Sequence, residues 1–519
     1  MNANPQTSFK TFRAKDWLTL AALILSSFVV WLNVTILNTD LPMIEKDLNA
    51  SLSELQWAVS IFSLCGGFII VSGRLADNYG RKHILSIGLI CFIVGSAICG
   101  FAGNIEWLIA GRAIQGIGGA MMLPASLALV EVSFHPPVRT TAIGLWIGLA
   151  WFAQALGPSI GGFAAETTQW QWAFHLTTLL AIITLILTLT SVKKIYTRPD
   201  KAYMDYLGAA LIMIAMFAII YSAIASGSTG WLQPSTLGLF FFGLLASAIF
   251  ILVEHKTKHP VASLILFKDR AFLGANVVNI ISNTVFASLV LYAAIYLEIV
   301  MDYQPFTVGL LLLPPTLSIL FTLQIGSKIY NHAGARMPTS VGMIMLTSGC
   351  LVIGLLTPHL GYNAMLAPFL IIGLGIGLFA SPITAAALAA SSHEAAGRAA
   401  ALFKASSMIG AALGIAFAGS IYQTMVSIML HRHLASAPEN IRETLYKIAG
   451  GNKHQINHLK VISPGEWHTY LNMTIDYINI AFTATVLVLA GIALLTTIFA
   501  SIIIPKKHHF FAVPSDHGN

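Results

Sequence analysis

The decapeptide Gly-Arg-Leu-Ala-Asp-Asn-Tyr-Gly-Arg-Lys, residues 73–82, joins two long apolar segments in the first fifth of the chain. Its two glycines let neighbouring helices approach closely, because glycine has no side chain to keep them apart. Its aspartate and its final basic pair can form charge-assisted hydrogen bonds with the ends of neighbouring helices. We predict a latch that holds one conformation of a membrane protein, although an ordinary basic loop is the alternative. The latch residues are Gly73, Asp77, Gly80, Arg81 and Lys82.

The composition of the whole chain excludes a water-soluble fold. Of its 519 residues, 56% are hydrophobic and only 9% are charged, and the mean hydropathy is +0.77. Soluble proteins carry roughly 25% charged residues. A helix of about 20 apolar residues crosses the hydrocarbon core of a bilayer, and the chain has room for about fourteen of them. The predicted spans are 17–39, 55–74, 83–103, 107–131, 141–164, 172–192, 206–226, 236–254, 272–297, 306–329, 338–358, 362–390, 401–427 and 477–504.

The distribution of charge predicts how these spans are oriented. An even number of spans puts both termini on one side, and the loops of that side carry most of the Lys and Arg residues, which assigns it to the cytoplasm. We therefore expect a multi-pass protein of the inner (plasma) membrane with both termini cytoplasmic. The net charge of +7 reflects this bias rather than nucleic-acid binding. The basic residues assigned to the cytoplasmic side are Lys10, Arg13, Lys15, Arg74, Arg81, Lys82, Arg139, Lys193, Lys194, Arg198, Lys201, Lys256, Lys258, Lys268, Arg270, Lys328, Arg336, Arg398, Lys404, Lys506 and Lys507.

Two further motifs lie inside spans. Arg112, about two turns from one end of span 107–131, is costly in lipid and needs a partner or a wet cavity, unless it snorkels to the interface. Span 141–164 contains a proline among glycines, which predicts a kinked and tightly packed helix. The motif residues are Arg112, Gln115, Gly116 and Gly118 in the first span, and Gly157, Pro158, Gly161 and Gly162 in the second.

Together these motifs resemble those of the major facilitator superfamily. The stretch 73–82 is similar to its signature loop, G-x-L-a-D-r-x-G-r-k. The pattern R-x-x-Q-G-x-G is matched from Arg112, and in that family the arginine is associated with proton coupling. The pattern G-P-x-x-G-G is similar to the motif of members that export by antiport. A degenerate second copy of the signature loop is found at Ser327, Asn331, Gly334 and Arg336.

The resemblance to the fourteen-span drug:proton antiporters of this superfamily, the multidrug efflux type, covers nearly the whole chain. It implies an all-α membrane protein with two six-helix bundles and two additional helices inserted between them. The expected parts are a cytoplasmic N-terminus (1–16), an N-terminal bundle (17–192), a linker with two extra spans (193–271), a C-terminal bundle (272–504) with a long outer loop (428–475), and a cytoplasmic tail (505–519).

The first span departs from the pattern of that subfamily. In L-D-x-T-I-V-N-x-A-L-P the embedded acid is replaced by Asn33, and an acid occurs instead at Asp40. Seven residues are nearly two helical turns, so these two residues share a helix face. Arg112, Asp40 and Asn33 are therefore the candidates for proton coupling, with Asp40 as the acid. The alternative is that Asp40 is a solvated residue at a helix end.

Polar uncharged residues mark a candidate substrate cavity. The chain has no acid in spans 306–329 or 401–427, where some relatives that recognise cations carry one, so cationic drugs are less expected as substrates. A neutral, anionic or zwitterionic ligand suits such a surface, although hydrogen bonds between helices suit it almost equally well. The candidates are Gln154, Asn276, Asn279, Asn283, Tyr292 and Gln324.

The sequence thus predicts a secondary active transporter that exports drugs or amphipathic metabolites by proton antiport and alternating access. The expected partners are a small-molecule substrate, protons and the lipid bilayer, and a periplasmic adaptor stays open because some relatives dock to one. No cofactor, metal site or enzymatic activity is expected. The alternatives are a dedicated exporter of one endogenous metabolite, such as a siderophore, and a non-transporting membrane sensor or enzyme.

Overall fold

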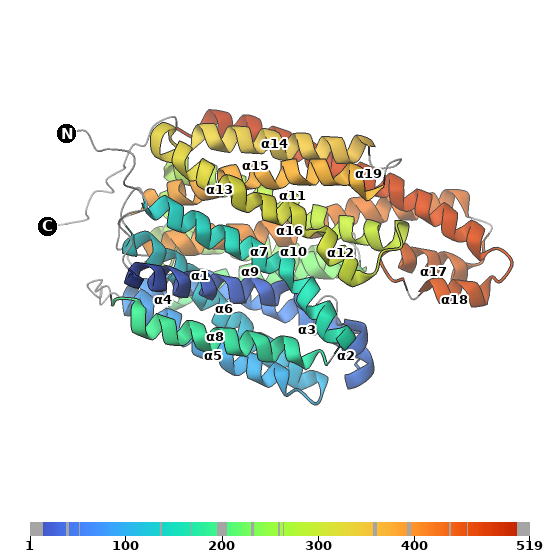
Figure 1. The fold of residues 1–519 in the computed structure, drawn as a ribbon, viewed down its shortest axis with the longest axis horizontal. Coiled ribbons are helices and arrows are strands. Elements are labelled where there is room, and N and C mark those ends of the chain that lie inside the picture. The colour runs from blue at the N-terminus through green and yellow to red at the C-terminus, as the bar shows by residue number, and fades with distance from the viewer. Residues whose placement is uncertain are drawn as a thin grey trace.

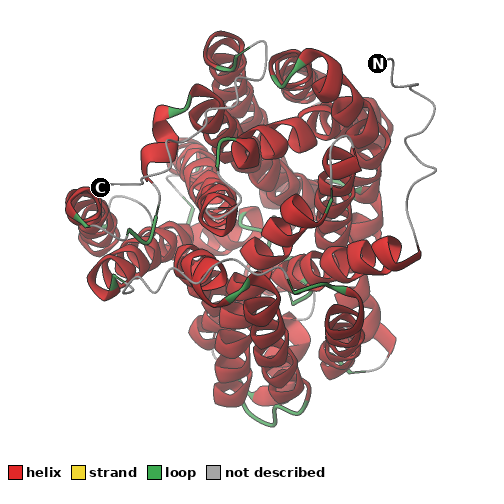
Figure 2. Cartoon of the chain, turned by 90° about the vertical axis from the view of Figure 1, so that its left-hand side faces the viewer, coloured by secondary structure: helices red, strands yellow, loops and turns green. Residues whose placement is uncertain are grey.

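The computed structural model is helical throughout the part of the chain that it describes, and no strand occurs there (Figure 2). Its helices run roughly parallel along the long axis of the molecule (Figure 1). The described residues are 14–37, 41–50, 52–134, 138–167, 169–194, 205–229, 233–257, 260–262, 264–356, 361–391, 396–434, 437–453 and 455–505.

The helices fall into two sets that follow one another in the chain. The first set is α1 (Ala14–Thr35), α2 (Leu41–Leu48), α3 (Leu52–Leu64), the 3-10 helix η2 (Cys65–Phe68), α4 (Ile69–Tyr79), α5 (Arg81–Gly100), α6 (Ile105–Ser133), α7 (Val138–Thr167) and α8 (Gln171–Ser191). The second set is α11 (Arg270–Ile295), the π-helix η4 (Tyr296–Val300), α12 (Pro305–Leu311), α13 (Leu313–Ala333), α14 (Arg336–Leu356), α15 (Tyr362–Ala389), α16 (Ala396–His433), α17 (Glu439–Ala449), α18 (Gln455–Ile462) and α19 (Trp467–Ile503). Between them lie α9 (Tyr206–Thr229), α10 (Pro234–Lys256) and the 3-10 helix η3 (Leu264–Lys268).

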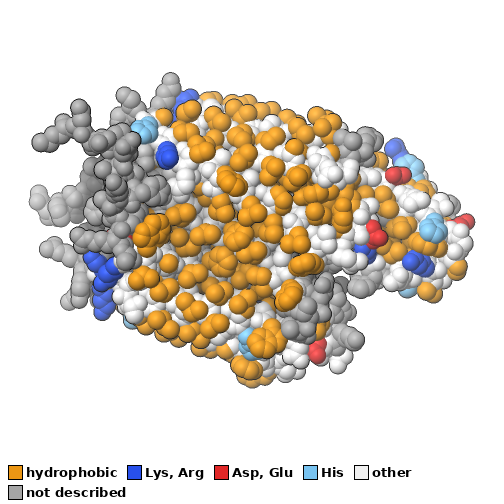
Figure 3. All heavy atoms as spheres, in the orientation of Figure 1, with side chains coloured by type: hydrophobic (Ala, Val, Ile, Leu, Met, Phe, Trp, Pro, Cys, Tyr) orange, Lys and Arg blue, Asp and Glu red, His pale blue; other side chains and the backbone are white. Residues whose placement is uncertain are grey.

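Thirteen of the described helices are long and apolar enough to cross a membrane. The described apolar part of α9, Tyr206–Ser222, is shorter than the length that a spanning helix needs, so the fourteenth span stays a prediction. Apolar side chains cover the middle of the face in Figure 3, while charged side chains gather toward its two ends. This pattern is that of a multi-pass membrane protein, and it confirms the all-α membrane fold.

The first set of helices occupies the lower part of Figure 1 and the second set the upper part. We call the end at which α1 begins and α19 ends the termini end, and the opposite end, where α17 and α18 lie, the hairpin end (Figure 1). Of the two inserted helices, α9 packs against α3, α4 and α16, and α10 packs mainly against α9. The Trp57 and Tyr221 rings stack 5.4 Å apart where α9 meets α3. The inserted pair therefore lies beside the boundary between the two halves.

The region predicted as a long outer loop, 428–475, is largely helical. The helix α16 continues to His433, α19 already begins at Trp467, and α17 and α18 form a helical hairpin between them. The hairpin buries the apolar side chains of Ile441, Leu445, Ile448 and Leu459. The hydroxyl of Tyr422 in α16 donates a hydrogen bond to the carbonyl of Ala449 (2.9 Å), which fixes the hairpin on the end of α16.

Side-chain caps and glycines determine several helix ends. The Asn104 carboxamide accepts a hydrogen bond from the Trp107 backbone N–H (3.0 Å) and begins α6. The Asp269 carboxylate accepts from Ala271 and Phe272 (2.7 and 3.0 Å) and begins α11. These caps satisfy backbone donors that would otherwise lack partners at the first turn.

Glycines bring neighbouring helices together in the same way in both halves. A Cβ atom on Gly88 of α5 would lie 2.9 Å from the carbonyl of Gly118 in α6, and one on Gly118 would lie 2.7 Å from the carbonyl of Gly88. In the second half, Gly375 of α15 faces Gly342 of α14. Gly88 and Gly342 are as far apart in the sequence as the two copies of the signature loop are. The close contact between α5 and α6 in the first half therefore has a counterpart between α14 and α15 in the second.

We expect Gly88→Val to destabilise the protein, because its side chain must push α5 away from α6, and overpacking a close contact costs about 1–3 kcal/mol. The control is Gly491→Val in α19, where an added Cβ atom meets no atom within 4 Å. Thermal unfolding of the purified proteins in detergent should show a melting temperature lowered by several degrees for the first variant only. Equal melting temperatures would contradict the close contact between α5 and α6.

Candidate functional site

The latch stretch is mostly helical rather than a loop. Residues 73–79 form the end of α4, and Gly80 alone separates this helix from α5. Gly80 has a φ of +96°, which suits glycine and strains residues with a side chain. Gly73 lies against α16, because a Cβ atom there would meet the carbonyl of Gly397 at 2.7 Å. The first and second halves therefore approach each other closely beside Asp77.

The Asp77 carboxylate joins the two halves. It accepts hydrogen bonds from the backbone N–H groups of Gly397 and Arg398, each at 3.0 Å. These groups belong to the first turn of α16, where the helix dipole favours a negative charge. Asp77 also pairs with Arg81 (3.2 Å) and with Arg398 (3.6 Å), and it is buried. Hydrogen bonds that involve an ionised group are the stronger kind, so Asp77 is a strong contact between α4 and α16 at the termini end.

The remaining latch residue, Lys82, acts within the first half. Its ammonium donates to the carbonyls of Leu189 (2.9 Å) and Val192 (2.7 Å) at the end of α8. A cation at the C-terminal end of a helix is favourable, because it faces the negative end of the helix dipole. Lys82 thus fixes α5 to α8 and does not reach the second half.

The degenerate copy of the signature loop makes the matching contact on the other side. Asn331 of α13 accepts a hydrogen bond from the Thr140 hydroxyl (3.1 Å) in the first turns of α7, and Ser327 donates to the Thr140 carbonyl (3.2 Å). Ser381 of α15 donates to the same carbonyl (2.9 Å). Gly334 has a φ of +79°, as Gly80 has a positive φ in the first copy. Two seams, here meaning contacts between the halves, therefore lie at the termini end, an ionic one at Asp77 and a neutral one at Asn331.

We expect Asp77→Asn to open the termini end, since the hydrogen bonds of an ionised group contribute about 1.5–3 kcal/mol each. Spin labels on exposed positions of the two halves, His83→Cys and Lys328→Cys in a chain without its native cysteines, report this by the distance between them. The population with a long distance should rise about tenfold or more relative to the closed one. The control is Asp269→Asn, which removes a helix-capping carboxylate inside the second half. An unchanged distance distribution in Asp77→Asn would contradict the latch.

Arg112 is fully buried about two turns from the hairpin end of α6. Its guanidinium donates to the carbonyls of Ala58 (3.2 Å) and Asn33 (3.1 Å) and to the Gln115 carboxamide (3.2 Å). It also lies 4.5 Å from the centre of the Phe62 ring. The arginine therefore ties α6 to α1 and α3 instead of snorkelling to the interface.

Gln115 completes this polar cluster. Its carboxamide nitrogen donates to the Asn33 carboxamide (3.2 Å) and to the Ser96 hydroxyl (2.6 Å). Within the described chain no carboxylate lies within 4.0 Å of Arg112, and its Nη2 atom has no hydrogen-bond partner there. Asp40, the predicted acid, lies outside the described residues. The cluster thus holds a positive charge with one donor left over.

The glycines of the two span motifs serve close packing. A Cβ atom on Gly116 would meet the carbonyl of Phe62 in α3 at 2.6 Å, and Gly118 faces α5 as described above. Gly157 lies against Thr35 at the end of α1, and the Thr35 hydroxyl donates to the carbonyl of Gln154 (2.7 Å). Gly161 is buried in α7, whereas the surroundings of Pro158 and Gly162 lie outside the described side chains.

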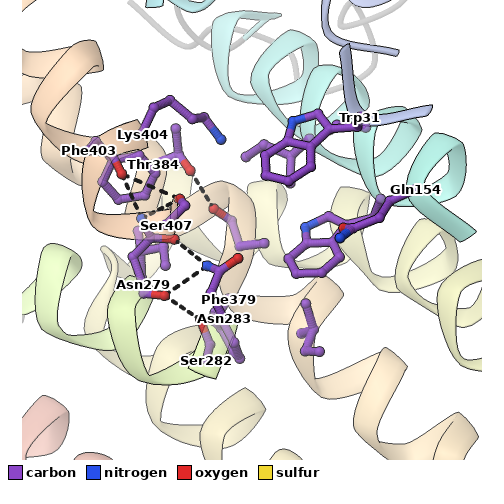
Figure 4. Close-up of a pocket in the computed structure, with 16 residues that line it drawn as sticks. Trp31, Gln154, Asn279, Ser282, Asn283, Phe379, Thr384, Phe403, Lys404 and Ser407 are labelled. Carbon is purple, nitrogen blue, oxygen red and sulfur yellow. Dashed lines mark hydrogen bonds between the residues drawn. The ribbon is translucent and has the colours of Figure 1, made fainter. Parts of the chain in front are cut away.

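A cavity lies between the two halves (Figure 4). The residues that line it come from α1 and α7 of the first half and from α11, α15 and α16 of the second. Predicted residues Gln154, Asn279 and Asn283 are among them. Its described lining residues are Trp31, Ile147, Ala150, Trp151, Gln154, Asn279, Ser282, Asn283, Ile376, Phe379, Ala380, Ile383, Thr384, Phe403, Lys404 and Ser407.

The other three predicted cavity residues do not belong to this lining. Asn276 donates to the carbonyl of Phe272 (2.9 Å) in its own helix. Tyr292 packs against Tyr422, with ring centres 4.8 Å apart, toward the hairpin end. Gln324 lies on α13, which contributes no residue to the cavity. Helical spacing alone placed these residues on plausible faces, but it could not show which faces meet at the centre.

The assignment of Lys404 to the basic cytoplasmic loops was wrong. The helix α16 begins at Ala396, so Lys404 lies more than two turns inside it, with 7% of its surface exposed. Its ammonium lies 4.6 Å from the centre of the Trp146 ring and borders the cavity. The sequence contained a signal, since a lysine flanked by Phe403 and small residues inside an apolar span is unusual.

Comparison with known proteins agrees with this architecture. Residues 23–415 match the family model described as Major Facilitator Superfamily. The chain is 30% identical over 424 residues to the multidrug resistance protein Stp of Mycobacterium tuberculosis strain H37Rv. The aligned region covers 81% of this chain and 78% of Stp. It is 28% identical over 418 residues to the quinolone resistance protein NorB of Staphylococcus aureus strain MRSA252, covering 80% and 90%.

Solved structures show the same fold at low sequence identity. The human organic anion transporter MFSD10 (TETRAN) superposes with a TM-score of 0.59 at 13% identity, covering 94% of this chain and all of the other. The proton:xylose symporter XylE gives the same TM-score and identity, covering 94% and 96%. The chain belongs to the major facilitator superfamily. It is a membrane transporter for small molecules and not an enzyme.

Proposed function

We propose that this transporter exports amphipathic small molecules by alternating access, driven by the entry of protons. The observation that carries the proposal is the cavity between two halves whose termini ends are joined by the Asp77 and Asn331 contacts. A site in the middle of the membrane that opens to one side at a time needs such separable contacts. The relatives Stp and NorB, named for drug resistance, and the G-P-x-x-G-G pattern from Gly157 support the outward direction.

Proton coupling would involve the polar cluster around Arg112. This cluster has an arginine with a spare donor, and Asp40 follows Asn33 by seven residues in sequence. The helix α1 ends at Thr35, so the prediction that these two residues share a helix face is wrong, and Asp40 would approach Arg112 from the segment after α1. An acid that meets this arginine only in one conformation would release its proton there, since a nearby positive charge favours the ionised carboxylate. The driving force is the membrane potential, worth about 2.3 kcal/mol per charge per 100 mV, together with the pH difference.

The proposal places the termini end in the cytoplasm of the inner membrane. Two exposed positions test it: Lys328→Cys at the termini end and Val461→Cys in the hairpin, whose side chain is 75% exposed. In cells with a permeabilised outer membrane, an impermeant maleimide should label Val461→Cys, and it should label Lys328→Cys only after the inner membrane is opened. The reverse pattern would invert the topology.

The coupling test is proton release on adding a substrate to the purified protein in weak buffer, with a quinolone as the first probe. Wild type should release protons, whereas Asp40→Asn and Arg112→Ala should not. The matched control is Glu443→Gln, which removes an exposed carboxylate paired only with Lys447 in the described hairpin. Asn33→Asp in the Asp40→Asn background should restore the signal, because it returns an acid to the side of Arg112.

The possible results separate the parts of the proposal. If Asp40→Asn still releases protons, Asp40 is not the coupling acid. If a substrate binds to wild type without any proton release, proton antiport is wrong, and the protein is a facilitator or an exporter coupled in another way.

A further inference from the structure

We propose that the central cavity recognises the anionic group of its substrate, a carboxylate or similar oxyanion on an aromatic skeleton, through Lys404 and the indole N–H of Trp31. The inference rests on the proposed function in one respect, because it takes the cavity to be the substrate site. It does not depend on proton coupling or on the direction of transport.

The charge of Lys404 is not neutralised by the described protein. No described carboxylate lies within 4.0 Å of its ammonium. Its neighbours are the rings of Trp146 and Phe403, with centres 4.6 and 5.8 Å away. Cation–π contacts stabilise an ammonium but leave its charge in place. A buried lysine in a membrane protein is costly and marks a functional site, and an anionic ligand would offset the cost.

The described lining of the cavity contains no acidic side chain. Among its described lining residues Lys404 is the one charged side chain, and neither Asp nor Glu occurs among them. A cavity for a cation would need the opposite charge, because a cationic ligand beside an unpaired lysine is repelled. The charge balance therefore favours an anion.

A second donor faces Lys404 from the other half of the molecule. Trp31 lies on α1, and its indole N–H is buried without a hydrogen-bond partner among the described residues. In Figure 4 the Lys404 side chain extends across the cavity toward the Trp31 ring. Buried donors without acceptors are uncommon in proteins, since each loses its hydrogen bonds with water. An oxyanion between Lys404 and Trp31 would satisfy both groups.

The asparagines of the cavity are not free to serve as these donors. The Asn279 carboxamide nitrogen lies 2.8 Å from the Phe403 carbonyl and from the hydroxyls of Ser406 and Ser407, so both of its N–H groups have acceptors. The Asn283 nitrogen donates to the carbonyl (2.8 Å) and the side-chain oxygen (3.0 Å) of Asn279. The Asn279 amide fixes α11 to α16, and neither asparagine nitrogen has an N–H group left for an anion.

The skeleton of the substrate follows from the walls of the cavity. Trp151 borders it and is held edge-on by Phe286, with ring centres 4.6 Å apart. With Trp31 and Phe379 it forms flat apolar surfaces on which an aromatic ring can stack. The cavity therefore suits an amphipathic aromatic acid.

Three ligands with the same ring and different charges test the inference: naphthalene-2-carboxylate, naphthalene-2-carboxamide and naphthalene-2-methylammonium. Equilibrium binding of each radiolabelled compound is measured on the purified full-length protein. Wild type should bind the carboxylate about tenfold or more tightly than the amide, and the ammonium weakest.

The variants assign this preference to the proposed groups. Lys404→Gln should weaken carboxylate binding about tenfold or more and leave amide binding within a factor of about two. Lys404→Arg should keep most of the preference. Trp31→Phe, which keeps a ring and removes the N–H, should weaken carboxylate binding severalfold. Lys328→Gln, at an exposed lysine away from the cavity, should behave as wild type. Retained amide binding shows that a variant is folded.

Contrary results are equally definite. Each of three results would overturn the inference. The first is that Lys404→Gln keeps the full preference for the carboxylate. The others are that wild type binds the ammonium most tightly, or that it binds none of the three ligands. Uptake by inverted vesicles keeps it separate from the proposed function. Export of cations without any role for Lys404 overturns the inference alone, whereas Lys404-dependent binding of the carboxylate without transport overturns the proposed function alone.

Discussion

Helices in hydrocarbon have no hydrophobic force to bring them together, because lipid chains are as apolar as their side chains. This transporter depends instead on close backbone contacts at glycines and on polar bonds between helices. The Gly88–Gly118 contact in the first half and the Gly342–Gly375 contact in the second are of the first kind. The contacts of Asn279 with α16 are of the second. These contacts stabilise the packing of helices within each half.

Buried polar groups mark the boundary between the halves and its neighbourhood. Asp77 and Arg112 both bond backbone groups of other helices, so each has a structural task that the described chain itself explains, although Arg112 keeps one donor without a partner there. Lys404 and the Trp31 indole are not satisfied in this way. The difference matters, because a buried group that the protein leaves without a counterpart is one that a ligand can complete.

The sequence was sufficient to predict the fold class, the superfamily and the repeat, because these follow from long apolar segments and from motifs with fixed spacing. It also predicted Arg112 as buried and in need of partners. It could not predict that these partners would be backbone carbonyls, which carry no sequence signal. Nor could it separate Asn279, which lines the cavity, from Asn276 one turn away, since both belong to a plausible face of one helix. Lys404 was misplaced because a charge near a predicted span end was treated as part of a loop.

The two copies of the signature loop join the halves at the same end of the molecule with different chemistry. The ionic seam at Asp77 and the neutral seam at Asn331 occupy equivalent places in the two copies. Exposing buried ionised partners requires more work than exposing neutral ones. The two seams therefore resist separation unequally, so a scaffold with repeated halves carries an asymmetric barrier to opening.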